Sequence, residues 1–357
     1  MELDHNQLIA SLAQRIGEVL KPLFPDGGKC ALLDFPNHGN VGDNAIWLGE
    51  KAYLRGINAS VVYTSDIATY SKAKLAKRLH GGIIFIHGGG SLGDVWLPHQ
   101  RFREKIISEF PDAQIIQLPQ TIHFKEKSNL QRARSIFNNH LNLTLLVRDI
   151  RSLEIARNEF RARSYLCPDM AFMLRGLPRP ELPKSKIVWL SRTDMESSGY
   201  FDFHPEPDVH QADWRRDPRT LVFRANNFLT RHSRSQTPVL SGFASSLSCA
   251  YDALARYRLL LGCRTLSQGR VVVTDRLHGH ILSLLLGIPN VLLDNNYGKV
   301  KSFYETWTKG CGLTVWADSL EEAFDAGRSL AEPSDHDRDF MNAQETVDRL
   351  AEEANRC

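Results

Sequence analysis

The segment 274–278 (TDRLH) places a guanidinium and an imidazole at the start of an apolar helix. It directly follows a valine run, 271–273, that is typical of a buried strand. A helix N-terminus offers unpaired N–H donors and the positive end of the helix dipole, and Arg276 adds a full positive charge. His278 can donate or accept a proton near neutral pH. The segment therefore predicts an anion site with an acid–base group beside it.

The same segment also permits a purely structural role. In that case Asp275 caps the helix or orients a neighbouring histidine, Arg276 lies at the surface and His278 packs inside. A zinc site is not predicted, because His278 and His280 are two residues apart and helical zinc ligands are spaced i, i+4. No metal and no cofactor are expected.

Further polar side chains follow predicted strands. Arg148 comes directly after the apolar run 143–147, and its planar fork suits a carboxylate or phosphate. In the loop 294–299, Lys299 can meet a phosphate and Asn295 a sugar. A solvated or salt-bridged role is open to each of them.

The loop 37–44 (NHGNVGDN) follows the first predicted strand. Asp43 or Asn44 can cap a helix that begins near residue 45. Alternatively Asn40, Gly42 and Asp43 form a polar loop that contacts a hydroxylated substrate.

The glycine run 87–93 (HGGGSLG) fits three motifs. The serine-hydrolase interpretation fails because oxyanion loop and nucleophile elbow would have to share one loop, whereas they normally follow different strands. The dinucleotide interpretation is disfavoured, because the run follows the third predicted strand of its unit and no acidic residue ends the next strand. What remains is that Gly88, Gly89 and Gly90 let the backbone approach a ligand and turn N–H groups outward, or form a tight turn without a ligand.

Composition favours a globular protein of the cytoplasm. The chain of 357 residues is 42% hydrophobic and 24% charged, with a net charge of +3, which gives no argument for a nucleic-acid partner. Six scattered cysteines without a C-x-x-C pair favour reduced thiols. The polar start does not resemble a signal peptide, and the most apolar run, 281–293, is too short to span a bilayer.

Helix and strand patterns alternate along the chain, which predicts an α/β protein with parallel sheets covered on both faces. We expect two Rossmann-like domains, 1–178 and 179–357, facing each other across a cleft, with the last helix free to pack back on the first domain. Ligands of such sheets bind beyond the carboxyl ends of the strands. The polar stretch 194–218 is expected to be a long loop or lid. The predicted helices are 8–19, 44–55, 71–79, 100–109, 127–139, 150–160, 247–261, 277–286, 318–330 and 338–355, and the predicted strands are 31–35, 61–63, 83–87, 114–118, 143–147, 164–167, 187–190, 270–274 and 290–293.

Five segments together resemble the polysaccharide pyruvyl transferases, in order over roughly residues 30–310: HGNVGDNAIW (38–47), GGIIFIHGGGSLGD (81–94), LLVRDIRS (145–152), CPDMAF (167–172) and TDRLHGHILSLLLGIPNVLLDNNYGK (274–299). The resemblance implies a GT-B-like fold and transfer of pyruvate from phosphoenolpyruvate to two sugar hydroxyls, as a cyclic ketal with release of phosphate. Arg276-Leu277-His278 matches the family's donor-binding and catalytic Arg-Leu-His, and Arg148 matches a second donor-binding arginine. The stretch 194–218 has no counterpart.

The partners implied are phosphoenolpyruvate, as co-substrate, and an oligosaccharide or lipid-linked saccharide of exopolysaccharide synthesis. Such acceptors are assembled at the inner face of the cytoplasmic membrane, which is compatible with a peripheral association. Two alternatives stay open. One is a GT-B glycosyltransferase that uses a nucleotide sugar, with Asp294 placed for the ribose; the other is a non-catalytic sugar-phosphate-binding protein.

Overall fold

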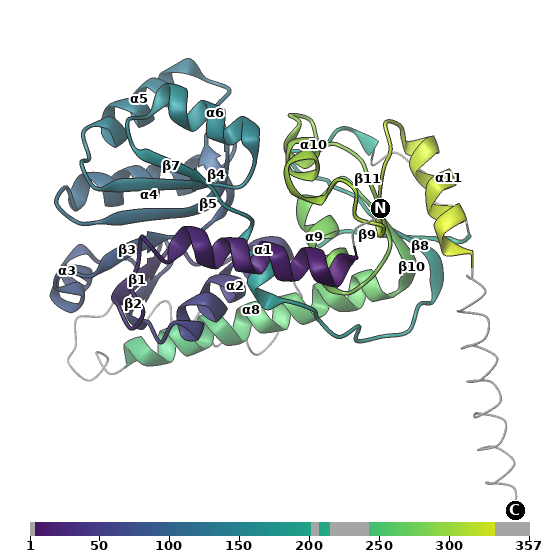
Figure 1. The fold of residues 1–357 in the computed structure, drawn as a ribbon, viewed down its shortest axis with the longest axis horizontal. Coiled ribbons are helices and arrows are strands. Elements are labelled where there is room, and N and C mark those ends of the chain that lie inside the picture. The colour runs from purple at the N-terminus through teal and green to yellow at the C-terminus, as the bar shows by residue number, and fades with distance from the viewer. Residues whose placement is uncertain (1–3, 201–206, 215–242, 333–357) are drawn as a thin grey trace, which may run out of the picture.

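A computed structural model describes residues 4–200, 207–214 and 243–332, which form two parallel sheets lying side by side (Figure 1). In the first sheet the strand order is β2-β1-β3-β5-β6-β7, and β4 also pairs with β5. Its strands are β1 (Lys29–Leu33), β2 (Ser60–Ser65), β3 (Ile83–Ile86), β4 (Gly89–Gly93), β5 (Ile115–His123), β6 (Leu143–Val147) and β7 (Arg163–Leu166). The helices of this part are α1 (His5–Leu20), α2 (Val41–Gly56), α3 (Lys72–Leu79), α4 (Leu97–Glu109), α5 (Lys127–Asn138), α6 (Ile150–Glu159) and the 3-10 helix η1 (Met170–Leu174).

The second sheet has the order β12-β11-β10-β8-β9, again with parallel pairing. Its strands are β8 (Ser185–Leu190), β9 (Val209–Ala212), β10 (Gly269–Thr274), β11 (Asn290–Leu292) and β12 (Thr314–Trp316). Its helical elements are α8 (Phe243–Ser267), α9 (Leu277–Leu285), α10 (Lys299–Phe303), the π-helical η4 (Tyr304–Thr308) and α11 (Leu320–Ala331).

Alternate side chains of the buried strands enter different apolar clusters, as the pleat of a strand requires. In β8, Val188 and Leu190 join one cluster, whereas Ile187 and Trp189 join another that lies against α11. The first of these clusters also contains Leu32 of β1, so it extends from one sheet to the other. The two sheets therefore share a continuous apolar core.

Two helices cross between the sheets along this core (Figure 1). The amphipathic helix α1 contacts both η1 and α9, and the long helix α8 contacts α2 and β2 as well as β8 and β10. Among the described residues these contacts join elements that precede and follow residue 178. The predicted boundary between residues 178 and 179 stays a prediction.

The predicted alternation of helices and strands is confirmed for the described residues, with three corrections. Helix α2 begins at Val41, not near residue 45, because the Asn40 side chain caps it by accepting from Gly42 N at 3.0 Å. The glycine run was expected to be a loop, but Gly89–Gly93 is strand β4, paired with an extended β5.

The third correction concerns the polar stretch 194–218, which was expected to be a loop or lid. It contains strand β9, whose sequence VHQA has only one fully buried side chain and so lacked a strand pattern. Residues 201–206 and 215–218 of this stretch, and the predicted helix 338–355, lie outside the described residues.

The contact of α2 with η1 requires a glycine inside a helix. A Cβ on Gly49 would collide with Met170 O and lie 3.2 Å from Ala171 Cα, whereas a Cβ on Gly56 of the same helix would meet nothing within 4 Å. Alanine normally stabilises a helix relative to glycine by up to about 1 kcal/mol. We expect Gly56→Ala to be neutral or stabilising, and Gly49→Ala to lower the free energy of unfolding by about 1–3 kcal/mol through overpacking. Denaturant titrations test this, and equal effects of the two substitutions would contradict the packing described.

Candidate functional site

A pocket of about 440 Å³ lies among the loops that follow strands of both sheets. It brings together most of the residues that the sequence predicted for the site, from segments far apart in the chain. Those lining it are Asn40, Asp43, Gly88, Gly90, Arg148, Arg276, Leu277, His278 and Lys299.

Three predicted residues do not line this pocket. Asn295 accepts from Lys299 N at 2.8 Å and so shapes the loop that carries Lys299. Gly42 leaves the space that the His278 ring occupies, because a Cβ there would collide with His278 Nδ1. Gly89 has a φ of +121° and faces Asp43 Oδ1 and Ile46. These residues position others at the pocket wall.

A buried carboxylate, Asp169, links a cation of the first sheet to the imidazole of the second. Asp169 Oδ2 accepts from Arg148 Nη1 at 2.5 Å and lies 3.4 Å from His278 Nε2. Burial by itself would raise the pKa of Asp169, but the charges of His278 and Arg148 and the N–H of Ala171 lower it well below the usual range. Asp169 is therefore an anion that holds Arg148 and His278 in place.

Arg276 is held by groups of its own sheet. Its Nε donates to Ser191 O at 3.2 Å and its Nη2 to Asp213 Oδ1 at 2.6 Å, while Nη1 lies 3.6 Å from Asp194 Oδ2. Burial and the neighbouring Arg192 lower the pKa of Arg276, against the opposing attraction of these carboxylates. These contacts fix the orientation of the Arg276 guanidinium at the wall of the pocket.

Lys299 is anchored by Glu196, which four side chains contact. Glu196 Oε2 accepts from Lys299 Nζ at 2.5 Å and Oε1 from Trp96 Nε1 at 2.9 Å. Arg192 and Tyr297 also contact Oε2, each at 3.1 Å. Burial by itself would raise the pKa of Glu196, but Lys299 and Arg192 lower it far below its ordinary value. Because Trp96 follows β4, Glu196 joins the two sides of the pocket.

The glycine run 87–93 has its backbone N–H groups bonded to buried side chains and leaves space for cations at Gly90. The N–H of Gly88 donates to buried Glu50, and those of Ser91 and Leu92 donate to buried Gln120. The prediction that this loop turns its N–H groups toward a ligand is therefore wrong for Gly88. A Cβ on Gly90 would lie 3.1 Å from Lys299 Nζ and 3.2 Å from Arg148 Nη2. Glycine at this position lets two cations from different sheets converge.

Asp275 neither caps helix α9 nor orients a histidine. The cap residue of α9 is Arg276, and both carboxylate oxygens of Asp275 lack a hydrogen-bond partner among the described residues. Burial raises the pKa of Asp275 to about 7, against the opposing attraction of Arg192 and Arg276. The carboxyl therefore keeps its proton in the folded chain well above the ordinary pKa.

Sequence reasoning missed the acidic partners of the cations and Arg192. All of them except Asp213 follow predicted strands, so the strand-end rule could have found them; Asp213 follows β9, which was not predicted. Asp169 also lies within one of the segments that carry the family resemblance. The residues missed are Asp169, Arg192, Asp194, Glu196 and Asp213.

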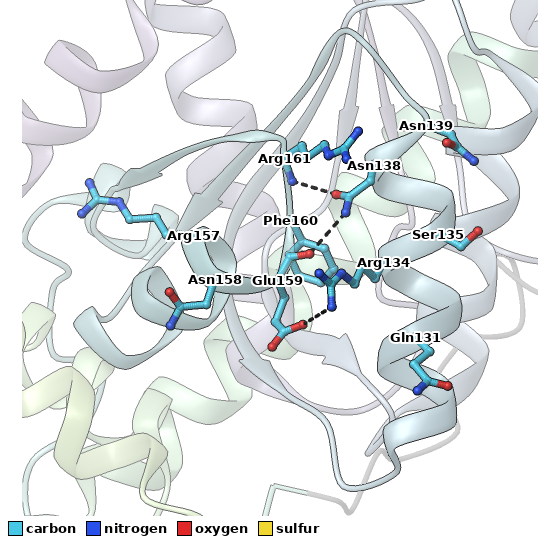
Figure 2. A pocket seen from close by; sticks show the side chains of 10 residues that line it. All are labelled: Gln131, Arg134, Ser135, Asn138, Asn139, Arg157, Asn158, Glu159, Phe160 and Arg161. Carbon is cyan, nitrogen blue, oxygen red and sulfur yellow. Dashed lines mark hydrogen bonds and ion pairs between the residues drawn. The ribbon is translucent and has the colours of Figure 1, made fainter.

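A second hollow, of about 460 Å³, lies at the carboxyl ends of α5 and α6 (Figure 2). Some of its polar groups pair with one another: Arg134 lies 3.6 Å from Glu159, and Asn138 Oδ1 accepts from Arg161 N at 2.7 Å. Figure 2 shows Arg157 pointing away from these pairs. Helix carboxyl ends also disfavour anions, so the pocket between the sheets is the candidate site.

The described residues contain neither a candidate metal site nor a candidate membrane span. No group of three or more histidine, cysteine, aspartate or glutamate side chains is placed there to hold a metal ion. No helix within the described ranges combines the length and apolar character needed to cross a membrane.

Comparisons with known proteins point to one family. The sequence model of the family described as polysaccharide pyruvyl transferase matches residues 40–297. "Pyruvyl transferase 1" of Schizosaccharomyces pombe is 33% identical over 85% of this chain and 76% of its own length. "Putative pyruvyl transferase EpsO" of Bacillus subtilis is 31% identical over 87% of this chain and 95% of its own length.

The fold also has a match among solved structures. A crystal structure of a functionally uncharacterised protein from Klebsiella pneumoniae subsp. pneumoniae NTUH-K2044 superposes with a TM-score of 0.56 at 17% identity. The match covers 86% of this chain and 99% of that protein. At this identity the likeness concerns the α/β fold alone.

The buried Asp275 makes stability depend on pH in a defined direction. An unfolded aspartate ionises near pH 4, whereas Asp275 in the folded chain ionises at about 7. Between these values the unfolded state binds fewer protons, so this group lowers the free energy of unfolding as pH rises, by up to about 1.4 kcal/mol per pH unit. Asp275→Asn removes that contribution.

We therefore expect the stability of Asp275→Asn relative to its parent to increase between about pH 4 and pH 7. Denaturant titrations of both proteins across this range measure the difference, in which the other titrating groups cancel. Two parallel stability curves would contradict the assignment.

Proposed function

This chain belongs to the polysaccharide pyruvyl transferase family, and we propose that it transfers pyruvate from phosphoenolpyruvate to a sugar of an exopolysaccharide or its lipid-linked precursor. The product is a cyclic ketal, and phosphate is released. The donor seat is formed by Arg148, Arg276 and Lys299, and His278 is the catalytic acid. The acceptor enters beside Asn40 and Asp43.

The observation that carries this proposal is the convergence of basic side chains on one imidazole. Arg148 and Lys299 both approach Gly90, and Asp169 ties Arg148 to His278. Phosphoenolpyruvate carries a carboxylate and a phosphate on three carbons, so it can engage several cations while its methylene carbon faces one imidazole. Guanidinium forks pair with both kinds of anion.

The reaction then follows from general acid catalysis. Protonated His278 delivers its proton to the methylene carbon, which makes the adjacent C2 cationic. A sugar hydroxyl adds to C2, the bond from C2 to the phosphate oxygen breaks, and a second hydroxyl closes the ketal. Acid catalysis of this kind contributes about 100- to 10,000-fold in rate.

The residues that line the pocket disfavour the alternative of a nucleotide-sugar glycosyltransferase. A nucleotide-sugar glycosyltransferase would need an acid for the ribose, but Asp294 Oδ1 accepts from Asn295 N and Lys301 N at 2.9 and 3.2 Å and Asp294 does not line the pocket. We propose a GT-B-like arrangement in which the two sheets belong to lobes on either side of the donor. We also propose action in the cytoplasm, at the membrane face where lipid-linked acceptors are assembled.

The direct test incubates the protein with phosphoenolpyruvate and a panel of free and lipid-linked glycans. We expect phosphate release coupled to an acid-labile ketal on the sugar, detected by mass spectrometry. A nucleotide released from a nucleotide sugar would instead indicate a glycosyltransferase. Thermal stabilisation by phosphoenolpyruvate without turnover would indicate a binding protein.

We expect His278→Ala to reduce turnover by about 100- to 10,000-fold, because the methylene carbon loses its proton donor. His280→Ala is not an adequate control, since His280 Nδ1 bonds buried Asn290 and its loss perturbs the core. Arg264→Ala on the exposed side of α8 is a suitable control that leaves the pocket intact. Phosphate release at parental rates from a folded His278→Ala variant would remove His278 from the mechanism.

A further inference from the structure

His87 lines the pocket on the side of the first sheet, and its Nε2 lacks a hydrogen-bond partner among the described residues. The His87 side chain is more than nine-tenths buried, at 6% exposure. The other imidazole of the pocket, His278, already has Asp169 beside its Nε2 at 3.4 Å. Buried polar atoms in native proteins nearly always have a partner, so an orphan beside a pocket points to a bound molecule. The mechanism above uses only His278.

The other nitrogen of His87 is fixed by a buried carboxylate. His87 Nδ1 lies 2.9 Å from Glu50 Oε2, and Glu50 Oε1 accepts from Gly88 N at 2.8 Å. Glu50 itself is fully buried on helix α2. An ionised carboxylate only accepts hydrogen bonds, so Nδ1 carries the hydrogen and Nε2 keeps its lone pair in the neutral ring.

The charges around His87 favour proton uptake. Burial by itself would lower the pKa of His87, but the charge and hydrogen bond of Glu50 raise it above its ordinary value, with smaller contributions from Asp43 and Asp34. Trp47 packs beside the ring and adds no charge. A base with these neighbours can take a proton near neutral pH.

Ketal formation needs such a base. Two O–H bonds of the acceptor break, two C–O bonds to C2 form, a C–H bond forms at the methylene carbon, and the C–O bond to phosphate breaks. His278 supplies the proton for carbon, and the departing phosphate takes one from solvent. Two hydroxyl protons must therefore be removed. His278 cannot accept the first of them, because in that step it is donating its own proton to the methylene carbon.

We propose that His87 is the catalytic base of the acceptor side, whose Nε2 receives the proton of the first hydroxyl as its oxygen bonds to C2. His87 then releases that proton to solvent, and the second hydroxyl returns a proton to His278, so protons balance over the cycle. Asp43 is less suited to this role because it already accepts from Asn40 Nδ2 at 2.8 Å. The inference rests on the proposed function.

The test compares His87→Gln with the parent, using phosphoenolpyruvate and a glycan that the parent converts. We expect kcat to fall by about 100- to 10,000-fold, while calorimetry shows phosphoenolpyruvate affinity within about threefold of the parent, since the cations of the donor seat are untouched. His140→Asn is the matched control, because His140 is equally buried and bonds only backbone groups away from the pocket.

A second variant guards against misfolding. His87→Gln leaves Glu50 as an unpaired buried charge, which is strongly destabilising, so the double variant H87Q/E50Q removes that charge as well and should show the same loss of kcat. Glu50→Gln alone keeps the base, and nuclear magnetic resonance of the ring nitrogens should show His87 titrating at lower pH than in the parent.

The outcomes separate the two proposals. One outcome is that the parent converts substrate while the kcat of H87Q/E50Q equals that of the His140→Asn control. That result overturns the role of His87 and leaves the proposed function standing. Equal losses of kcat and of phosphoenolpyruvate affinity also overturn it, since His87 would then belong to the donor seat. So does a neutral form of the parental His87 ring that carries its hydrogen on Nε2 and not on Nδ1. If the parent protein releases no phosphate from phosphoenolpyruvate with any acceptor, both proposals are wrong.

Discussion

The pocket depends on one buried carboxylate that is shared between the two sheets. Asp169, after β7, contacts Arg148 of the first sheet and His278 of the second. Because Arg148 and Asp169 are both buried, removing either side chain leaves an uncompensated buried charge, a change that commonly costs about 3–5 kcal/mol. The side chains of Arg148 and His278 are therefore placed by the same interaction and cannot be repositioned independently.

The same principle extends to the other cations. Arg276 is held by Asp213, and Lys299 by Glu196, which also accepts from Trp96 on the opposite wall. Each long basic side chain is ordered before any ligand arrives, so its rotamer entropy is lost on folding and not on binding. Such preorganised charge is what stabilises developing charge in a water-poor site. The carboxylates also lower the net positive charge that an entering anion meets.

Sequence reasoning found the residues that follow strong strand and helix signals and missed those whose meaning depends on distant partners. Arg276 and His278 were predictable because a valine strand precedes them and an apolar helix follows. Asp213 was not, because the strand before it has little apolar pattern. The role of the glycine run could not be predicted either, since the groups that accept from its backbone N–H groups, Glu50 for Gly88 and Gln120 for Ser91 and Leu92, are far away in the sequence. Local pattern thus identified most of the predicted residues that line the pocket, whereas the charge pairs that shape the pocket are products of the tertiary fold.

The proposed function requires that the pocket between the sheets binds phosphoenolpyruvate with its methylene carbon at His278. A crystal structure of the protein soaked with phosphoenolpyruvate tests this directly. We expect carboxylate and phosphate oxygens on Arg148, Arg276 and Lys299, and the methylene carbon next to the His278 ring. Phosphoenolpyruvate bound elsewhere, or seated in the pocket with its phosphate and not its methylene carbon against His278, would contradict this expectation.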